Sequence, residues 1–135
     1  MMIATLALRQ ALFSALNAHP GLANALGGAK VYDEPPRTIA FPYVTMGDAS
    51  ATDWSTGSST GIEHALTLHI WSREGGQKQA HLIAGEMLQA MEAVNLTVPG
   101  HRLVNLRFAT ADIRREKDGA TWHGIVRFRA VTEPA

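Results

Sequence analysis

The clearest pattern of apolar and polar positions in the chain runs from Ile62 to Val94. Apolar and polar residues alternate from Ile62 to Trp71, which is the period of a half-buried β-strand. After Gly75 and Gly76, apolar residues recur at helical spacing and form one narrow stripe. That stripe consists of Ala80, Ile83, Ala84, Met87, Leu88, Met91 and Val94. The pattern predicts a strand, a sharp corner and an amphipathic helix that lies on a sheet.

Residues 4–18 predict a first helix with the same helical spacing of apolar residues. Its apolar face is expected to comprise Leu8, Leu12, Ala15 and Leu16, widened by Ile3, Leu6 and Phe13. Pro20 ends this helix, because a proline disfavours the α conformation in the residue before it. Residues 22–26 leave room for one more helical turn before Gly27 and Gly28.

Two short strands are expected at residues 29–32 and 41–47, separated by the acidic, proline-rich segment that begins with Asp33 and Glu34. Residues 48–61 are almost wholly small and polar, and this composition predicts a long loop. Trp54 is its one large apolar residue. It has two interpretations of equal weight: a docking residue that becomes ordered on contact with a partner, or a side chain that folds back onto the core.

The last third of the chain predicts a hairpin of strands 103–114 and 121–132. Asp118-Gly119 is typical of a two-residue type I′ turn, which would place Lys117 opposite Ala120 and Ile113 opposite Gly124. The face beneath the helices would then carry Ala109, Ala111, Val126, Phe128 and Ala130. The other face would carry Val104, Leu106, Phe108, Ile125, Arg127, Arg129 and Val131. A single bulge would invert part of this assignment.

That second face mixes hydrophobic residues with arginines, a composition found at contacts between subunits. The alternative is a solvated face on which arginine stems cover apolar neighbours. The acidic segment of a neighbouring copy would complement the positive charge of the hairpin. The residues inferred to form a subunit or partner interface are Asp33, Glu34, Trp54, Arg107, Arg114, Arg115, Arg127 and Arg129.

Composition places the chain among globular proteins, with 46% hydrophobic and 18% charged residues in 135. We expect a single domain over residues 1–135 with an α+β fold: a mostly antiparallel sheet of four or five strands packed against two helices. Twelve basic and twelve acidic residues cancel, which disfavours a DNA-binding module. Arg9 interrupts the apolar N-terminus, and no segment is apolar enough for a membrane span, so we expect a soluble protein that remains in the cell.

No motif in the sequence indicates catalysis or a cofactor. The chain has no cysteine, and its six histidines show no paired metal-ligand spacing. His64 and His69 are five apart on one predicted strand, so their side chains should point to opposite faces. Neither a nucleophile motif nor a phosphate-binding glycine loop is present. We expect a protein that is not an enzyme, with no metal site and no cofactor.

Several stretches follow one another in an order that resembles a known family. They are VYDEPP, FPYVTMGD, DWSTGSSTG, LTLHIWSREGGQKQA and HRLVNLRFATADIRREKDGATWHGIVRFRAVTE. Together they resemble the DUF3168 proteins of tailed phages, the tail completion or tail terminator proteins. They are most similar to the version in alphaproteobacterial gene transfer agents, which are phage-derived particles that package host DNA. The resemblance extends over essentially the whole chain.

The resemblance implies a structural subunit without catalytic activity, assembled in the bacterial cytoplasm as a hexameric ring. The ring would cap the head-proximal end of the tail tube, stop its polymerisation and join it to a head–tail connector or stopper protein at the head–tail junction. DNA would pass through the lumen without sequence-specific binding, and no membrane would be involved. Two alternatives are another neck component, such as a head-closure or head–tail joining protein, and a small binding domain of a cellular protein.

Overall fold

The computed structural model describes residues 2–74, 76–93 and 96–135, in which three helices and five strands are present. The helices are α1 (Met2–Ala18), α2 (Pro20–Leu26) and α3 (Gln77–Ala93). The strands are β1 (Val31–Tyr32), β2 (Tyr43–Asp53), β3 (Ile62–Ser72), β4 (His101–Arg115) and β5 (Trp122–Pro134). None of the described helices is long and apolar enough to cross a lipid bilayer.

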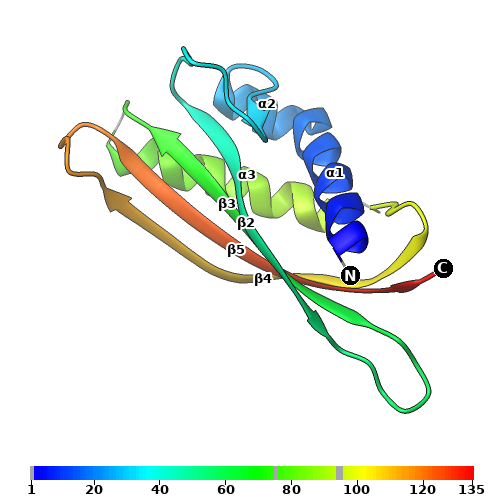
Figure 1. Cartoon of the computed structure of the whole chain (residues 1–135). Helices are drawn as coiled ribbons and strands as arrows, with labels where there is room; N and C mark the ends of the chain where they lie inside the picture. The colour runs from blue at the N-terminus through cyan, green and yellow to red at the C-terminus, as the bar shows by residue number, and fades with distance from the viewer. Residues whose placement is uncertain (1, 75, 94–95) are drawn as a thin grey trace.

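The five strands form one sheet in the order β1-β2-β3-β5-β4 (Figure 1). All neighbours are antiparallel except β1 and β2, which run parallel, so the sheet is mixed. The helices cover one face of this sheet: α1 contacts β1 and β2, whereas α3 contacts β3, β5 and β4. The expected α+β fold is confirmed, and the short helix α2 forms where one additional turn was expected.

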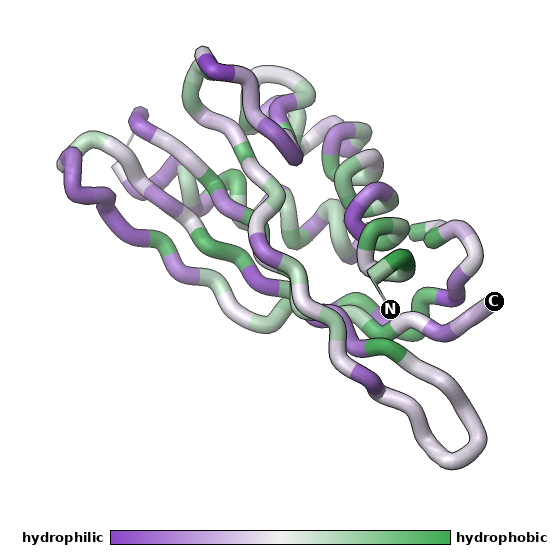
Figure 2. Tube along the Cα trace, viewed as in Figure 1, coloured by the Kyte–Doolittle hydropathy of each residue, from purple (hydrophilic) through white to green (hydrophobic). Residues whose placement is uncertain are grey.

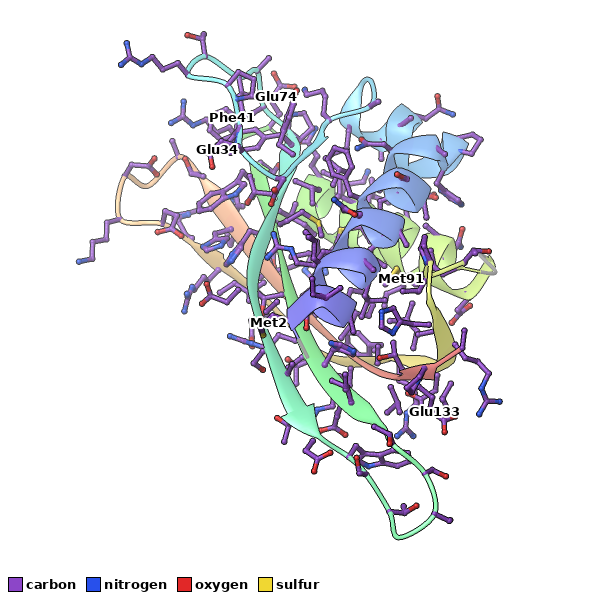
Figure 3. The ribbon with its side chains drawn as sticks, turned by 45° about the vertical axis from the view of Figure 1, so that its right-hand side comes forward. Met2, Glu34, Phe41, Glu74, Met91 and Glu133 are labelled. Atoms are coloured by element: carbon purple, nitrogen blue, oxygen red, sulfur yellow. The ribbon has the colours of Figure 1, made fainter. Side chains whose placement is uncertain are left out.

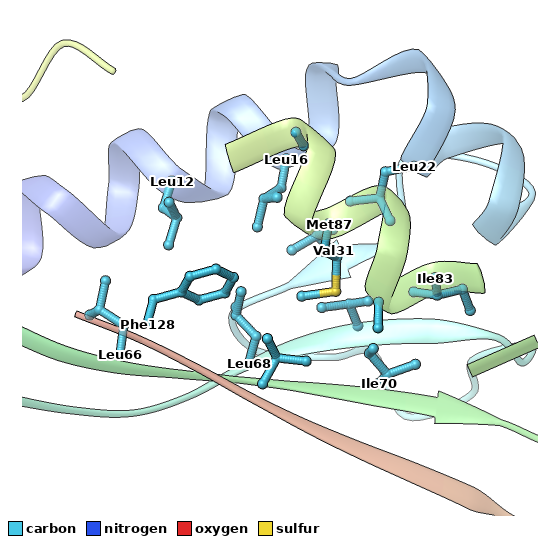
Figure 4. Close-up of a cluster of buried hydrophobic side chains, with 14 of the residues drawn as sticks. Leu12, Leu16, Leu22, Val31, Leu66, Leu68, Ile70, Ile83, Met87 and Phe128 are labelled. Carbon is cyan, nitrogen blue, oxygen red and sulfur yellow. The ribbon is translucent and has the colours of Figure 1, made fainter. Parts of the chain in front are cut away.

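The core lies between this face of the sheet and the helices (Figure 4). Leu66, Leu68 and Ile70 of β3 are buried, as their alternation predicts, and Phe128 of β5 is only 1% exposed. Above them lie the buried helix residues Leu12, Leu16, Ile83 and Met87, and Leu8 of α1 is buried as well. The predicted stripe of α3 therefore faces the sheet, although its last member, Val94, and Gly75 of the preceding corner lie outside the described residues.

The apolar face of α1 is narrower than the sequence predicts. Leu8, Leu12 and Leu16 are buried, but Ile3 is 74% exposed and Leu6 is 53% exposed, with Phe13 also on the surface. The reason is that β1 has only two residues, so the sheet beneath α1 is too narrow to cover more than one stripe of the helix.

Strand β2 continues six residues beyond its predicted end at Gly47. The strand passes an irregularity between Met46 and Ala49 and then pairs with β3 as far as Asp53. The predicted loop over 48–61 is therefore confined to residues 54–61. Main-chain pairing with β3 holds these small polar residues in a strand, although their side chains carry no strand pattern.

The β4–β5 hairpin has the predicted register but not the predicted turn. Ile113 lies opposite Gly124. In the described chain only glycines adopt positive φ, so Asp118 does not take the conformation that a type I′ turn needs. Instead its carboxylate accepts hydrogen bonds from the backbone N–H groups of Ala120 (2.9 Å) and Thr121 (2.8 Å). These hydrogen bonds lower the pKa of Asp118 to about 2; the largest effect comes from the Thr121 hydroxyl, followed by the backbone N–H groups of Thr121 and Ala120.

Two irregularities in β4 change which face its residues occupy. The pairing with β5 shifts between Leu103 and Asn105 and again between Phe108 and Thr110. Leu106 lies opposite Ala130 and Phe108 opposite Phe128, so both are on the helix side. Their predicted position on the opposite face is wrong, because each bulge reverses the alternation that follows it.

The packing of the core predicts that replacing Phe128 and replacing Phe108 have very different effects on stability. Replacing the buried Phe128 with alanine removes a ring from the core between the sheet and the helices and leaves a cavity, which should lower the free energy of unfolding by about 3–5 kcal/mol. The matched change at Phe108, which is 49% exposed, should cost about 1 kcal/mol or less. Urea unfolding followed by circular dichroism measures both; equal losses would contradict this description of the core.

Candidate interaction surfaces

The face of the sheet opposite the helices, here called the open face, is basic along its outer strands. Arg107 of β4 lies directly opposite Arg129 of β5, and Arg127 lies on the same face. Arg127 is 3.5 Å from Asp112 and Arg129 is 3.9 Å from Glu63, but all four side chains are more than a third exposed to solvent, so these ion pairs contribute little to stability. Because like charges directly opposite one another are unfavourable, an acidic partner would stabilise this arrangement.

The other two predicted arginines are near the hairpin turn. Arg114 lies opposite His123 and therefore also belongs to the open face. Arg115 points to the other side, where its guanidinium lies 4.8 Å above the ring of Trp122. Both are exposed, and the end of the hairpin that carries them is the most hydrophilic part of β4 and β5 (Figure 2).

A stack of aromatic and histidine rings occupies the open face beside the hairpin turn. Trp71 and His123 stack with their centroids 4.0 Å apart, and Tyr43 continues the stack on the other side of Trp71. His69 Nδ1 is 2.7 Å from His123 Nε2, and His123 Nδ1 is 2.6 Å from a carboxylate oxygen of Glu116. Sequence analysis missed this cluster, because it depends on the register between β3 and β5, which no local pattern encodes.

A neutral imidazole donates through one ring nitrogen and accepts through the other. With Glu116 accepting from His123 Nδ1, the His123 Nε2 atom accepts from His69 Nδ1, and protonating both rings would oppose two donors. Burial, followed by the neighbouring His123, lowers the pKa of His69. Among the described residues, no group of three or more His, Asp or Glu side chains has an arrangement that could hold a metal ion.

The predicted acidic residues lie on the loop between β1 and β2. Asp33 forms an ion pair with Arg9 of α1, 2.7 Å between Nη2 and Oδ1, and Arg9 also donates to the carbonyl of Gly47 at 3.2 Å. Glu34 follows on the exposed, proline-rich part of the loop (Figure 3). The loop thus presents one tethered and one outward carboxylate at the β1 side of the sheet.

Trp54 begins the loop that connects β2 and β3. Its backbone N–H donates to the carbonyl of Gly61 at 2.8 Å, and its ring lies against that glycine, where an added Cβ would be 3.1 Å from the ring. The side chain is 49% exposed, so the interpretation that it folds into the core is wrong. Its docking role remains a prediction, and the loop projects beyond the helices (Figure 1).

The two edges of the sheet carry opposite charges. β1 pairs only with Val44 and Thr45, so in the described chain no strand covers β2 from Met46 onward. β4 forms the other edge along its whole length. Residues 33–53, which lead to and form the first edge, contain four acids and one base, whereas residues 101–115 contain four bases and one acid.

A groove runs between α1 and the uncovered part of β2. Its volume is about 360 Å³, and Leu6 and Phe13 of α1 line it together with Met46 of β2. Arg9 and Asp33 form its polar border. Apolar side chains beside a free strand edge are typical of sites that receive an extended segment with large side chains.

Comparison with known proteins gives concordant results for sequence and structure. A family model described as tail completion protein gp17 matches residues 10–133. Tail completion protein gp17 of Bacillus phage SPP1 is 30% identical over 129 residues, which cover 94% of this chain and 92% of that protein.

Two solved structures share the fold. A chain in the virion of a native gene transfer agent particle matches with a TM-score of 0.85 and 29% identity, covering 93% of this chain and 94% of that one. The structure of bacteriophage SPP1 gp17 matches with a TM-score of 0.67 and 28% identity, covering 94% and 89%. These relatives are structural proteins of phage and phage-like particles, not enzymes.

The histidine pair predicts a pH dependence of stability. The pKa of His69 is lower in the folded chain than its ordinary value of 6.5. As the pH falls below 6.5, the unfolded chain therefore takes up a proton at His69 before the folded chain does. The free energy of unfolding should therefore decrease from about pH 7 to pH 5, and His69→Gln should reduce this slope.

Urea titrations at a series of pH values measure the free energy of unfolding of the wild type and of the His69→Gln variant. Part of the slope should persist in the variant, because burial also lowers the pKa of His64, which is enclosed between Thr5 and Thr132. An unchanged slope in His69→Gln would contradict the assignment.

Proposed function

This chain belongs to the tail completion protein gp17 family, and we propose that its copies form a hexameric ring that caps the head-proximal end of a tail tube. The ring stops tube polymerisation and joins the tail to a head–tail connector or stopper protein. Each copy acts as a single tail terminator-like domain over residues 1–135. The likeness to phage tail completion proteins, expected from sequence motifs, is confirmed at the level of the family.

The observation that carries this proposal is the match along nearly the whole chain to a subunit of a gene transfer agent virion. A match of this extent supports the same structural role in a particle. Its partners are then further copies of itself and the tail tube and connector proteins, with DNA passing through the lumen without sequence-specific contacts. Assembly takes place in the bacterial cytoplasm, and the assembled ring sits at the head–tail junction.

The distribution of charge supports closure into a ring. A ring requires heterologous contacts, in which one patch of a subunit meets a different patch of the next. Asp33 and Glu34 lie on the β1 side of the sheet, and the arginines of β4 lie at its opposite edge. Arg107, Arg114 and Arg115 provide the basic contact, with Arg127 and Arg129 on the adjacent strand, and Trp54 provides a contact to a neighbouring ring or tube protein.

Deleting the gene in a producing strain tests this role. Without the cap, tube subunits should continue to add, and heads should not join tails, so electron microscopy should show free heads and free tails of abnormal length. The wild-type gene supplied in trans is the control and should restore joined particles of normal tail length. Joined particles of normal length in the deletion strain would overturn the proposal.

Averaged images of purified particles should also show density with sixfold symmetry at the head–tail junction. When the chain carries an affinity tag, a label that binds the tag should appear at this density. The label distinguishes this role from the alternatives, because a head-closure or joining protein would be labelled at another level of the neck. Label on the capsid or baseplate would contradict any role at the neck.

A further inference from the structure

We propose that the sheet continues from one copy to the next: β2 of one copy pairs with β4 of its neighbour, and Phe108 of that neighbour enters the groove beside α1. This inference rests on the ring assembly proposed above and specifies the contact that closes it. Its occupant is therefore a second copy of this chain.

Strand directions permit this pairing without rearrangement. In the order β1-β2-β3-β5-β4, three successive antiparallel steps lead from β2 to β4, so these two strands run in opposite directions. Rotation about an axis along the strands preserves these directions and keeps the helices on the same side of every sheet. β4 of the next copy then meets β2 antiparallel, as two neighbouring strands of one sheet.

The backbone of β2 offers hydrogen-bonding groups at the required edge. The N–H of Trp54 donates across the hairpin to Gly61, and N–H groups alternate between the two sides of a strand. The N–H groups of Ala49, Ala51 and Asp53 therefore point away from β3, toward the uncovered edge. A long uncovered edge of this kind is a template for another strand.

On the helix side of the sheet, the apolar side chains beside β2 and on β4 are complementary across the proposed contact between two copies. Phe108 is on the helix side of β4, is 49% exposed and contacts its own chain edge-on through Phe128. The groove beside β2 is on the helix side as well, and its apolar walls are Leu6 and Phe13. In the proposed contact the Phe108 ring lies in this groove, which would account for the apolar residues that α1 exposes and the sheet of its own copy does not cover.

Charges favour the same partner. Acids predominate in residues 33–53 and bases in residues 101–115, so β2 attracts β4 and each edge repels a copy of itself. An unrelated acidic or apolar segment would satisfy only one of these features, whereas β4 of a second copy satisfies the hydrogen bonds, the apolar contact and the charge together.

Cross-linking inside particles tests the contact directly, because the chain has no cysteine of its own. In a chain with both Phe13→Cys and Phe108→Cys, mild oxidation of purified particles should produce a ladder of disulfide-linked multimers on non-reducing gels. The matched control pairs Phe13→Cys with Leu82→Cys, an exposed apolar position on α3, and should remain monomeric.

The result separates this inference from the proposed function. Joined particles that contain the Phe13–Phe108 double variant but give no ladder would overturn the strand contact and leave the tail-end role intact. A chain absent from the head–tail junction would instead overturn the proposed function.

A second variant tests the hydrogen bonds if the cysteine pair prevents assembly. Ala51→Pro removes an outward N–H without removing a bond to β3, since proline is tolerated at strand edges. Supplied to the deletion strain, it should fold, with the circular dichroism spectrum of the wild type, but fail to restore joined particles. Ala51→Ser keeps the N–H and should restore them; equal rescue by both variants would overturn the inference.

Discussion

Helices bury only one face of the sheet, and the rest of the molecular surface depends on this asymmetry. Phe128 and Leu68 lie beneath α1 and α3, whereas the open face must be compatible with water or a partner. The open face is accordingly built from arginines, acids and a ring stack in which His123 contacts both His69 and Glu116, and Trp71 donates to Thr45. The sheet also fails to cover all of α1 at its β1 edge, because β1 is too short to extend beneath the outer side of that helix. Exposed Leu6 and Phe13 follow from that shortness.

Elements with a strong local period could be predicted from the sequence. The alternation through β3 and the stripe of α3 specify which side is buried, because each repeats over several turns or residues. The hairpin register, with Ile113 opposite Gly124, followed from a turn between two apolar strands even though the turn conformation was wrong. In that turn Gly119 supplies the positive φ (73°), and the Asp118 carboxylate fixes the return of the chain by accepting hydrogen bonds from the backbone N–H and the hydroxyl of Thr121.

What sequence reasoning missed depends on long-range pairing. The bulges in β4 leave no signal in composition, yet they moved Leu106 and Phe108 to the helix side. The strand from Ala49 to Asp53 is held by β3 rather than by its own side chains. The arginine positions were predicted correctly as exposed, but only the sheet order reveals that they and the acidic loop lie on opposite sides of the molecule. The family likeness supports the proposed function, because the sequence contains no catalytic or metal-binding motif from which a function could be predicted.

The net charge of zero conceals a separation of charge that restricts how copies can meet. A two-fold contact between two β4 strands would bring their arginines together, and a two-fold contact between two β2 edges would bring acids together. Both contacts are unfavourable, so in the proposed ring unlike edges meet and the contact is head-to-tail. Head-to-tail contacts either continue without limit or close, and closure satisfies both edges of every copy. A long free edge is otherwise a liability for a folded chain. In the proposed ring, opposite charges on the two edges would therefore favour closed assembly over contacts between like edges.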